Sequence, residues 1–534
     1  MDRYELIVIG AGPAGLCAAI EAASSGMKTI VFDENARPGG QLFKQIHKFF
    51  GSKEHRAKKR GFRIGEELLK QAEDAGVDVR LNATVMGIFQ NKEITVMTGD
   101  HIEHFKGDNI VVATGASENM VAFPGWTLPG VMGAGAAQTL MNLHGIKPGE
   151  RVLMVGSGNV GLVVSFQLLQ AGSEVAAIID AAPRIGGYGV HAAKVVRTGV
   201  PVYLSHTVIQ AQGEDRVTGA VIGEVDKNWQ IIAGSEKHLE VDAICLAVGL
   251  SPMSQLTRMT GCKMADSPAK GGLVPVCNTF GETSVQGIFC AGDVSGIEEA
   301  SSAMIQGYIA GAAAARRSGY ITDEVFLKKE QKLYASLGQL RGGMFGGKNK
   351  GRTDLTHTDE GVPLSETLLK KGYIGETEIL NFPGANGYKK KGIHPVIECT
   401  QNIPCNPCQD ACAKGCIVVG KNITSLPVVS EQAQCTGCGM CVASCPGQAI
   451  FLIDEDYAKG FSAVSLPYEL LPLPKTGDRG VALDRSGKSL CPAEIVAVKT
   501  AKAMDETAIL TMKVPAEMSS KARFFRLEGV SDDE

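Results

Sequence analysis

Cysteines at short, regular spacing are the first residues in this 534-residue chain that could do chemistry. The chain has 15 cysteines, and nine of them lie between Cys399 and Cys445. Thiolates at such spacing bind zinc or iron–sulfur clusters. A disulfide framework is the alternative, but it is typical of small secreted domains. In a long chain without an export signal, the clustering favours metal.

The last four of these cysteines form the pattern C-x2-C-x2-C-x3-C-P, which runs from Cys435 to Pro446. This pattern resembles the bacterial two-cluster ferredoxins. In them, three thiolates hold one [4Fe–4S] cluster and the fourth reaches the other cluster. A four-cysteine zinc site is the chemical alternative. The Cys-Pro ending favours two [4Fe–4S] clusters.

The preceding stretch has five cysteines where half of such a module needs four. Cys445 is followed four residues later by Ala-Ile, and Cys412 is followed four residues later by Cys416-Ile417. This match aligns Cys412 with Cys445 and makes Cys416 the extra cysteine. The predicted ligands are Cys399, Cys405, Cys408 and Cys445 for one cluster, and Cys435, Cys438, Cys441 and Cys412 for the other. A rival register uses Cys405, Cys408, Cys412 and Cys416 and leaves Cys399 free.

A glycine-rich turn near the N-terminus joins two apolar runs, Tyr4–Ile9 and Thr29–Phe32, through a helical stretch. This order predicts a dinucleotide-binding fold. Glycines allow the tight turn, the approach of a pyrophosphate and the packing of helix on strand, and an acid follows for the ribose. The helix N-terminus offers N–H groups to phosphate. The candidate residues are Gly10, Gly12, Pro13, Ala14, Gly15, Asp33 and Glu34. The alternative is a glycine-rich turn without a ligand.

The same pattern recurs after Arg151–Val155, so the chain is expected to contain two dinucleotide folds. The second set of candidates is Gly156, Gly158, Asn159, Val160, Gly161 and Asp180. An acid at Asp180 favours NAD over NADP, because a carboxylate accepts the free ribose hydroxyls. Arg184 lies close enough in sequence to keep NADP open. A degenerate fold that binds nothing is the further alternative.

The overall composition is that of an ordinary globular protein with three or four domains. Hydrophobic residues make up 44% and charged residues 21%, and the net charge is −4. Such a charge gives no reason to expect a nucleic-acid partner or an anionic membrane surface. The apolar runs are too short for a membrane span, and the N-terminus lacks a basic leader. We therefore expect a cytoplasmic protein.

Several further segments resemble flavoprotein reductases with two dinucleotide domains, such as thioredoxin reductase. They are DENARPGGQL (33–42), VVATGA (111–116) and GIFCAGDV (287–294). The resemblance implies that the first fold binds FAD and that the second binds NAD(H). It also implies that a helix beginning near Gly296 points at the flavin. The further FAD contacts that it implies are Gly40, Gln41, Val85, Ala113, Thr114, Gly115, Gly292 and Asp293.

The stretch TLPGVMGAGAAQTLM (127–141) resembles the flavoproteins of the sarcosine oxidase, opine oxidase and hydrogen cyanide synthase group. The reactive CxxC pair of thioredoxin reductase is absent, so disulfide reduction is not expected. The resemblance implies an FAD and iron–sulfur subunit of an amine or amino-acid (imino-acid) dehydrogenase complex. Its partner would be a separate FAD-containing subunit, with NAD(H) or a ferredoxin-type carrier exchanging electrons. No catalytic residue is predicted.

Two other functions remain open on the same residues. One is a free-standing NADH-dependent oxidoreductase that resembles the glutamate synthase small subunits. The other is a non-catalytic, electron-conducting scaffold subunit whose second fold is empty.

The expected fold class is α/β, with two Rossmann-like domains of which the NAD domain is inserted into a discontinuous FAD domain. A two-[4Fe–4S] ferredoxin-like module and a small β-rich C-terminal domain follow. The expected boundaries are 1–120 with 255–325 for FAD, 121–254 for NAD, 326–394 for a connecting region, 395–454 for the cluster module and 455–534 for the β-rich domain.

Overall fold

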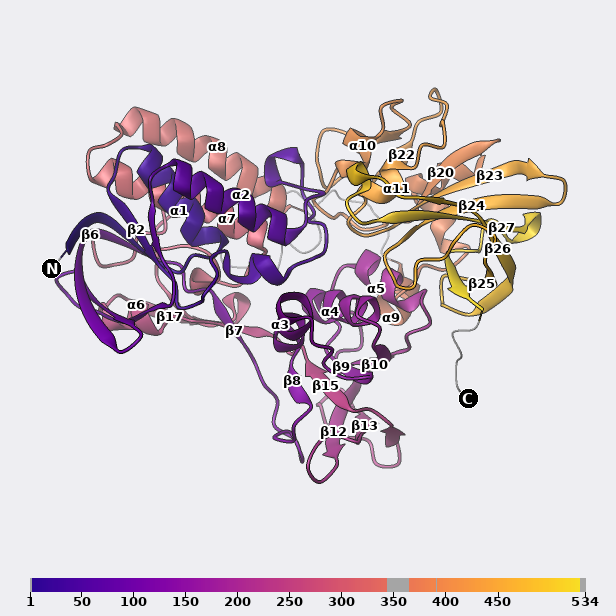
Figure 1. Ribbon diagram of the computed structural model, residues 1–534, viewed down its shortest axis with the longest axis horizontal. Coiled ribbons are helices and arrows are strands. Elements are labelled where there is room, and N and C mark those ends of the chain that lie inside the picture. The colour runs from indigo at the N-terminus through magenta and orange to yellow at the C-terminus, as the bar shows by residue number, and fades with distance from the viewer. Residues whose placement is uncertain (1, 343–364, 390, 529–534) are drawn as a thin grey trace. The chain divides into compact units, whose positions relative to one another are not determined.

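The computed structural model describes residues 2–342, 365–389 and 391–528. The chain forms two compact units, each built from two segments (Figure 1). The first unit joins Met1–Asn119 to Gly249–His357, and the second joins Met120–Val248 to Thr358–Glu534. Part of the expected connecting region, residues 343–364, lies outside the described residues.

The first unit is built on a seven-stranded sheet of order β3-β2-β1-β6-β5-β4, in which β19 also pairs with β6. Strands β1, β2, β3, β6 and β19 pair in parallel, and β4, β5 and β6 form an antiparallel meander. The central strands are apolar runs because both of their faces are buried. The bounds are β1 (Asp2–Ile9), β2 (Thr29–Phe32), β3 (Asp78–Arg80), β4 (Ala83–Ile88), β5 (Glu93–Thr98), β6 (His101–Val112) and β19 (Ile288–Cys290).

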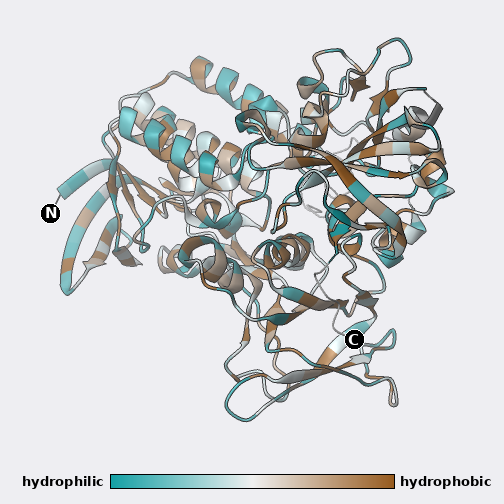
Figure 2. Ribbon diagram, turned by 45° about the vertical axis from the view of Figure 1, so that its right-hand side comes forward, coloured by the Kyte–Doolittle hydropathy of each residue, from teal (hydrophilic) through white to brown (hydrophobic). Residues whose placement is uncertain are grey.

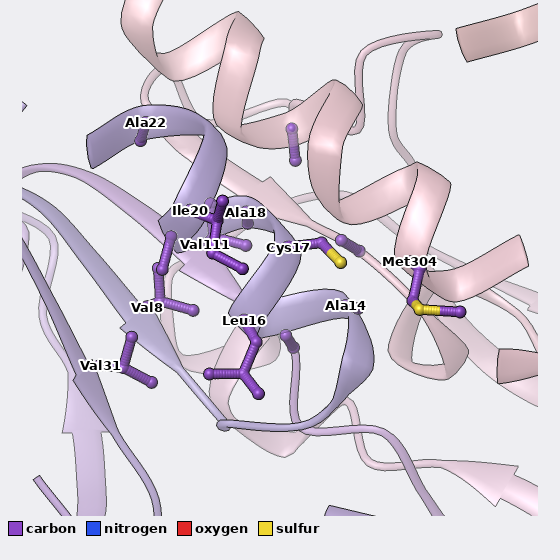
Figure 3. Packing of buried hydrophobic residues seen from close by; sticks show 14 of the residues in the cluster. Val8, Ala14, Leu16, Cys17, Ala18, Ile20, Ala22, Val31, Val111 and Met304 are labelled. Carbon is purple, nitrogen blue, oxygen red and sulfur yellow. The ribbon is translucent and has the colours of Figure 1, made fainter. Parts of the chain in front are cut away.

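Two helices of the first unit, α1 (Pro13–Ser24) and α7 (Ala300–Arg317), pack closely through small residues. A Cβ on Gly307 would overlap the carbonyl oxygen of Ala14, so only glycine permits this approach. Figure 3 shows Leu16 and Val8 on the sheet side of α1 and Cys17 directed toward Met304 of α7. Other helices of this unit are α2 (Gly61–Asp74), α6 (Gln255–Met259) and α8 (Asp323–Arg341).

The chain leaves and re-enters the first unit through a short antiparallel pair, β7 (Ala116–Glu118) with β16 (Leu250–Pro252). The hydroxyl of Thr114 donates to the carbonyl of Met253 at 2.7 Å and ties the two crossings together. A further hairpin in this unit pairs β17 (Met264–Ser267) with β18 (Gly272–Pro275).

The second unit begins with a parallel five-stranded sheet of order β11-β10-β9-β15-β8. An antiparallel sheet of β12, β13 and β14 follows. The strand bounds are β8 (Val131–Gly133), β9 (Arg151–Val155), β10 (Glu174–Asp180), β11 (Val202–Leu204), β12 (His206–Gln212), β13 (Gly219–Glu224), β14 (Lys237–Leu239) and β15 (Ala243–Leu246). The helices are α3 (Ala134–His144), α4 (Asn159–Gln170) and α5 (Gly189–Val196).

The C-terminal part of the second unit is an antiparallel seven-stranded sheet of order β20-β23-β24-β27-β26-β25-β28. Its bounds are β20 (Ile393–Ile397), β23 (Ile450–Ala458), β24 (Phe461–Tyr468), β25 (Arg479–Leu483), β26 (Ser489–Lys499), β27 (Ala508–Pro515) and β28 (Phe524–Leu527). The cysteine-rich segment between β20 and β23 holds α10 (Pro407–Ala411), β21 (Ile417–Val418), β22 (Val428–Val429) and α11 (Met440–Ser444), and α9 (Glu366–Lys371) precedes it.

The mixed α/β class and the β-rich C-terminal region are confirmed. Two expected boundaries fall inside elements, because α8 spans 325–326 and β23 spans 454–455. The strands that bracket the cysteines therefore share one sheet with the C-terminal strands. Figure 2 shows hydrophobic residues along the strands of both units. Within the described residues, no helix combines the length and apolar character that a bilayer span requires.

Candidate cofactor sites

The first glycine loop has the backbone shape that a dinucleotide requires. Gly10 adopts φ +101°, which favours glycine, and a Cβ on Gly15 would overlap the carbonyl oxygen of Gly10. Gly15 therefore lets α1 sit directly against the loop. A Cβ on Gly12 would meet no atom of the described residues within 4 Å, so they leave the space in front of this residue open. The structure fits a pyrophosphate at this position, beside the N-terminus of α1.

The two acids at the end of β2 have different environments. Asp33 is buried, and its carboxylate accepts from the amide of Ala11 at 2.6 Å and from the amide of Asn35 at 2.8 Å. Its first structural task is to hold the glycine loop. Glu34, by contrast, is exposed. The carboxylate of this second acid is therefore accessible to a polar ligand such as a ribose.

A second glycine pair packs on the first loop. The amide of Gly39 donates to the carbonyl of Ala11 at 2.6 Å, and a Cβ on Gly40 would lie 3.0 Å from the Cα of Gly12. Gln41, the next residue, is exposed. The predicted neighbours Gly12 and Gly40 are thus brought together, and Gln41 follows Gly40 in the chain.

The remaining predicted flavin contacts come from other parts of the first unit. Val85 is buried on β4, and Gly115 adopts φ +75° beside the crossing strands, next to Ala113 and Thr114. A Cβ on Gly292 would lie 2.9 Å from the Cβ of Ala14, which places Gly292 against the start of α1. The helix expected near Gly296 begins at Ala300, after a 3-10 turn over Asp293–Ser295. The carbonyl of Ala113 and the amide of Thr114 lie against Gly10, and Gly292 lies against α1, so these three residues adjoin the glycine loop.

Asp293 occupies this 3-10 turn. Burial raises its pKa to about 6, although an amide hydrogen bond from Glu298 at 3.1 Å opposes the shift. A partly buried carboxylate with one amide donor is suited to accept a second hydrogen bond from a hydroxyl-bearing ligand.

The second glycine loop repeats the first. Gly156 has φ +112°, and a Cβ on Gly161 would overlap the carbonyl oxygen of Gly156. A Cβ on Gly158 would again meet none of the described residues within 4 Å. Asn159 begins α4, and its side-chain oxygen accepts from the amide of Tyr188 at 2.8 Å. Val160, on the first turn, is exposed.

Asp180 occupies the position that Asp33 has in the first fold. Its carboxylate accepts from the amide and the hydroxyl of Ser157, at 2.7 and 2.6 Å, and from the amide of Ala182 at 2.9 Å. Both carboxylate oxygens are therefore engaged with the chain itself. Arg184, which kept NADP open, forms an exposed ion pair with Glu366 at 2.8 Å.

Helix α5 connects the second glycine loop to the cysteine-rich segment within the second unit. Before the helix, a Cβ on Gly186 would lie 3.8 Å from the Cα of Gly158. At the start of the helix, the amide of Gly189 donates to the side chain of Gln401 at 2.7 Å. After its end, Arg197 donates to the carbonyl of Gln448 at 2.9 Å.

The predicted cluster ligands separate into two electrostatic groups. Burial, and to a smaller extent the neighbouring Cys445, raise the pKa of the Cys399 thiol to about 12. The pKa of the Cys408 thiol is raised by burial and then by Cys445 and Cys399. The pKa of the Cys441 thiol is raised by burial, then by Cys435, Cys412 and Cys438, and least by Cys408. Cys405 lies just before α10, and its amide donates to the carbonyl of Ile423 at 2.7 Å.

Backbone N–H groups point at several of these sulfurs. The amide of Ala449 donates to Cys445 Sγ at 3.4 Å, and the amide of Cys416 donates to Cys412 Sγ at 3.2 Å. The amide of Gly437 donates to Cys435 Sγ at 3.4 Å. Such bonds stabilise thiolates, so the donor set fits an iron–sulfur cluster.

In the described part of the chain, no group of three His, Cys, Asp or Glu side chains is arranged to hold a single metal ion. A four-iron cluster is larger than one ion and takes one thiolate on each iron. Its ligands therefore lie farther apart than those around zinc.

Sequence reasoning missed two groups of side chains. Arg197, Arg485 and Arg523 lie around Glu398, which precedes a predicted ligand. Separately, the pKa of Cys290 is raised by burial and by its neighbour Cys277. The only sequence signal for the first group is the position of Glu398 next to Cys399.

Comparison with known proteins decides the family. Residues 4–317 match the model described as pyridine nucleotide-disulphide oxidoreductase. The chain belongs to this family. It is therefore an oxidoreductase whose family implies FAD and nucleotide binding. Residues 428–451 match the 4Fe-4S binding domain, which implies a cluster at the second cysteine run.

Relatives of known activity include an opine oxidase subunit from Rhizobium meliloti. It is 30% identical over 334 residues, which cover 59% of this chain and 62% of that protein. Hydrogen cyanide synthase subunit HcnB from Pseudomonas aeruginosa is 29% identical over 328 residues. These residues cover 57% of this chain and 69% of that protein. The chain thus spans less than two thirds of the opine oxidase protein. Both similarities confirm the resemblance expected from residues 127–141.

Among solved structures, thioredoxin reductase from T. acidophilum matches with a TM-score of 0.50 and 20% identity. The match covers 60% of this chain and 99% of that chain. It confirms the two-dinucleotide fold alone.

Proposed function

We propose that the chain is the FAD- and iron–sulfur-containing subunit of a cytoplasmic amine or amino-acid (imino-acid) dehydrogenase complex. It moves electrons between FAD, two [4Fe–4S] clusters and NAD(H) or a ferredoxin-type carrier. The observation that carries the proposal is the presence in one chain of two open glycine loops and two groups of thiols. FAD, when bound, supplies the conversion between two-electron and one-electron steps.

The chain's own residues have distinct tasks in this proposal. Gly12 and the N-terminus of α1 bind the pyrophosphate of FAD, and Asp33 holds the loop in shape. Glu34 and Asp293 accept hydrogen bonds from the sugar and ribityl hydroxyls. The second loop, at Gly158, binds the nicotinamide dinucleotide.

The two proposed clusters use the first of the two cysteine registers. Its support is the equivalence of two N–H···S bonds, since Cys416 donates to Cys412 as Ala449 donates to Cys445. Cys416 thus takes the place of an alanine in the other half. Its buried side chain then has a packing role rather than a ligand role.

The relatives support a hetero-oligomer, because the matched proteins are themselves named as subunits. The proposed partner is a separate FAD-containing subunit that oxidises a secondary amine or an amino acid. A ferredoxin is the candidate carrier.

The test is anaerobic co-purification of the native protein with its partners. We expect one FAD per chain, about eight irons from two four-iron clusters, and a second flavoprotein in the same particle. Stoichiometric zinc without acid-labile sulfide would refute the clusters. A lone chain with steady NADH–dye activity would favour the free-standing oxidoreductase, and failure to bind NADH would favour the scaffold subunit.

The register is tested by removing one cysteine at a time. Cys416→Ala should retain both clusters, whereas Cys399→Ala should damage one, because a lost thiolate opens a coordination position on iron. Iron content and low-temperature electron spin resonance of the dithionite-reduced variants give the answer. Loss of a cluster in Cys416→Ala with a normal spectrum in Cys399→Ala would reverse the assignment.

A further inference from the structure

A group of buried charged side chains adjoins one of the two thiol groups in the second unit. Glu398 accepts from Arg485 at 2.6 Å and from Arg523 at 2.6 Å. Arg523 is 1% exposed and Arg197 is 4% exposed. The guanidinium carbons of Arg523 and Arg197 lie 4.9 and 5.4 Å from the centre of the Phe451 ring.

The positive charges in this group outnumber the negative one. Arg485 and Arg523 both donate to the same carboxylate oxygen of Glu398, Oε1, at 2.6 Å. Burial lowers the pKa of Arg197 to about 10, so it stays protonated at neutral pH. Three guanidiniums therefore surround one carboxylate. Uncompensated buried charge is strongly unfavourable, so a further anion beside this group would stabilise it.

The unmatched charge lies beside the thiols. Arg197 interacts electrostatically with Cys445 as well as with Glu398. Its Nε is buried and has no hydrogen-bond partner among the described residues. Glu398 directly precedes Cys399, and its amide donates to the carbonyl of Ala449 at 2.8 Å. A cluster held by Cys399, Cys405, Cys408 and Cys445 is anionic, and it becomes more anionic when it gains an electron.

The other thiol group has a wetter environment. Cys438 is exposed. Lys499, which donates to the carbonyl of Gly437 at 3.0 Å, is itself exposed. An exposed charge is screened by water and salt, whereas a buried charge is not.

We propose that Arg197, backed by Arg485 and Arg523, raises the reduction potential of the cluster bound by Cys399, Cys405, Cys408 and Cys445 above that of the second cluster. The inference rests on the two clusters of the proposed function. When both clusters are bound, the buried positive charge beside the first would stabilise its reduced form, so that it would accept an electron given up by the second. Arg197 is a positioning residue, since it acts through the field at the cluster and through its bond to Gln448.

The test is a redox titration of the anaerobically purified, cluster-loaded full chain, followed by electron spin resonance. Two clusters with separate midpoints are expected, and a Cys435→Ala variant identifies the higher one as the Cys399 cluster. Arg197→Gln should lower the reduced-to-oxidised ratio of that cluster tenfold or more at fixed ambient potential. A tenfold change corresponds to a fall in midpoint potential of about 59 mV for one electron. Arg197→Lys, which keeps the charge, should shift it less.

Lys499→Gln is the matched control and should leave the Cys399 cluster unchanged. An unchanged midpoint in Arg197→Gln with full iron content would overturn the proposal. If Arg197→Gln loses iron, the wild-type titration decides, since equal midpoints, or a lower one for the Cys399 cluster, would overturn it. Iron for only one cluster in the wild-type chain would instead contradict the proposed function.

Discussion

The two dinucleotide folds share a backbone but differ in the side chains at the end of the strand that follows the loop helix. Gly15 and Gly161 bring their helices equally close to the preceding turn, and Gly12 and Gly158 both face open space. After its buried aspartate, the first fold has the exposed Glu34, whereas the second has Ala181. Glycine spacing therefore gives both folds the same loop, and the polar side chains beside the loop distinguish the two folds.

Adding a methyl group at matched glycines of the two loops tests whether the loops bind separate ligands. Gly15→Ala should cost about 3 kcal/mol of unfolding free energy in the first unit and abolish FAD binding, because the Cβ overlaps backbone. Gly12→Ala should leave stability unchanged and weaken FAD alone. Flavin absorbance and thermal unfolding measure both effects. Gly161→Ala is the matched control; if it released FAD as readily as Gly15→Ala does, the two loops would not serve separate ligands.

The pH dependence of the flavin-free protein sharpens the account of the first fold. The pKa of Asp293 is raised by burial to about 6. Between about pH 4 and pH 6 the unfolded chain releases this proton while the folded chain keeps it, so stability falls as pH rises through this window. The loss is at most about 3 kcal/mol and levels off above pH 6. Denaturant titrations at pH 4.5 and 7 should show this fall in the free energy of unfolding in wild type and a smaller fall in Asp293→Asn. An identical fall in the variant would show that another group causes it.

Substitution of the exposed acid Glu34 should have a smaller effect, on the affinity for FAD. Glu34→Gln should weaken FAD binding about tenfold, since a hydrogen bond to a charged group contributes about 1.5 kcal/mol. Fluorescence titration of flavin-free protein with FAD measures the dissociation constant. Ala181→Glu, at the matched position of the second fold, should leave that constant unchanged. An unaltered affinity in Glu34→Gln would remove this residue from the flavin site.

The smallest expected effect concerns nucleotide choice at the second loop. Wild type should reduce its flavin faster with NADH than with NADPH, and Asp180→Ala should diminish that preference several-fold. Because Asp180 also holds Ser157, Ser157→Ala is the control for a loosened loop. Stopped-flow flavin reduction gives the rates. Preference for NADPH in wild type, or reduction by neither nucleotide, would show the assignment of Asp180 to be wrong.

Most of the successful predictions about the fold rested on patterns within short segments of the sequence. Both glycine loops and the mixed α/β class followed from spacing, because each loop is built from residues within one short segment. The helix expected near Gly296 begins at Ala300, after a separate turn over Asp293–Ser295. The order of residues could not show that turn.

Long-range features escaped prediction for a physical reason. Arg197, Arg485 and Arg523 come from three distant segments, and only the folded second unit brings them to Glu398. Likewise, the acids Asp33 and Asp180 were interpreted as ribose ligands, yet both bind the amide groups of their own loops. Their ribose contacts stay a prediction.

The pairing of β20 with β23 has a consequence for how the protein is assembled. Ile397 pairs with Ile450, so the whole cysteine-rich segment is a loop whose two ends meet at the base of the sheet. Cys399 lies just inside one end and Cys445 just inside the other. A single cluster that bound both cysteines would act as a cross-link between the two ends of the loop. It would stabilise the fold by lowering the conformational entropy of the unfolded chain. Iron loading would then be a late step of folding, completed only after the β23 segment has left the ribosome.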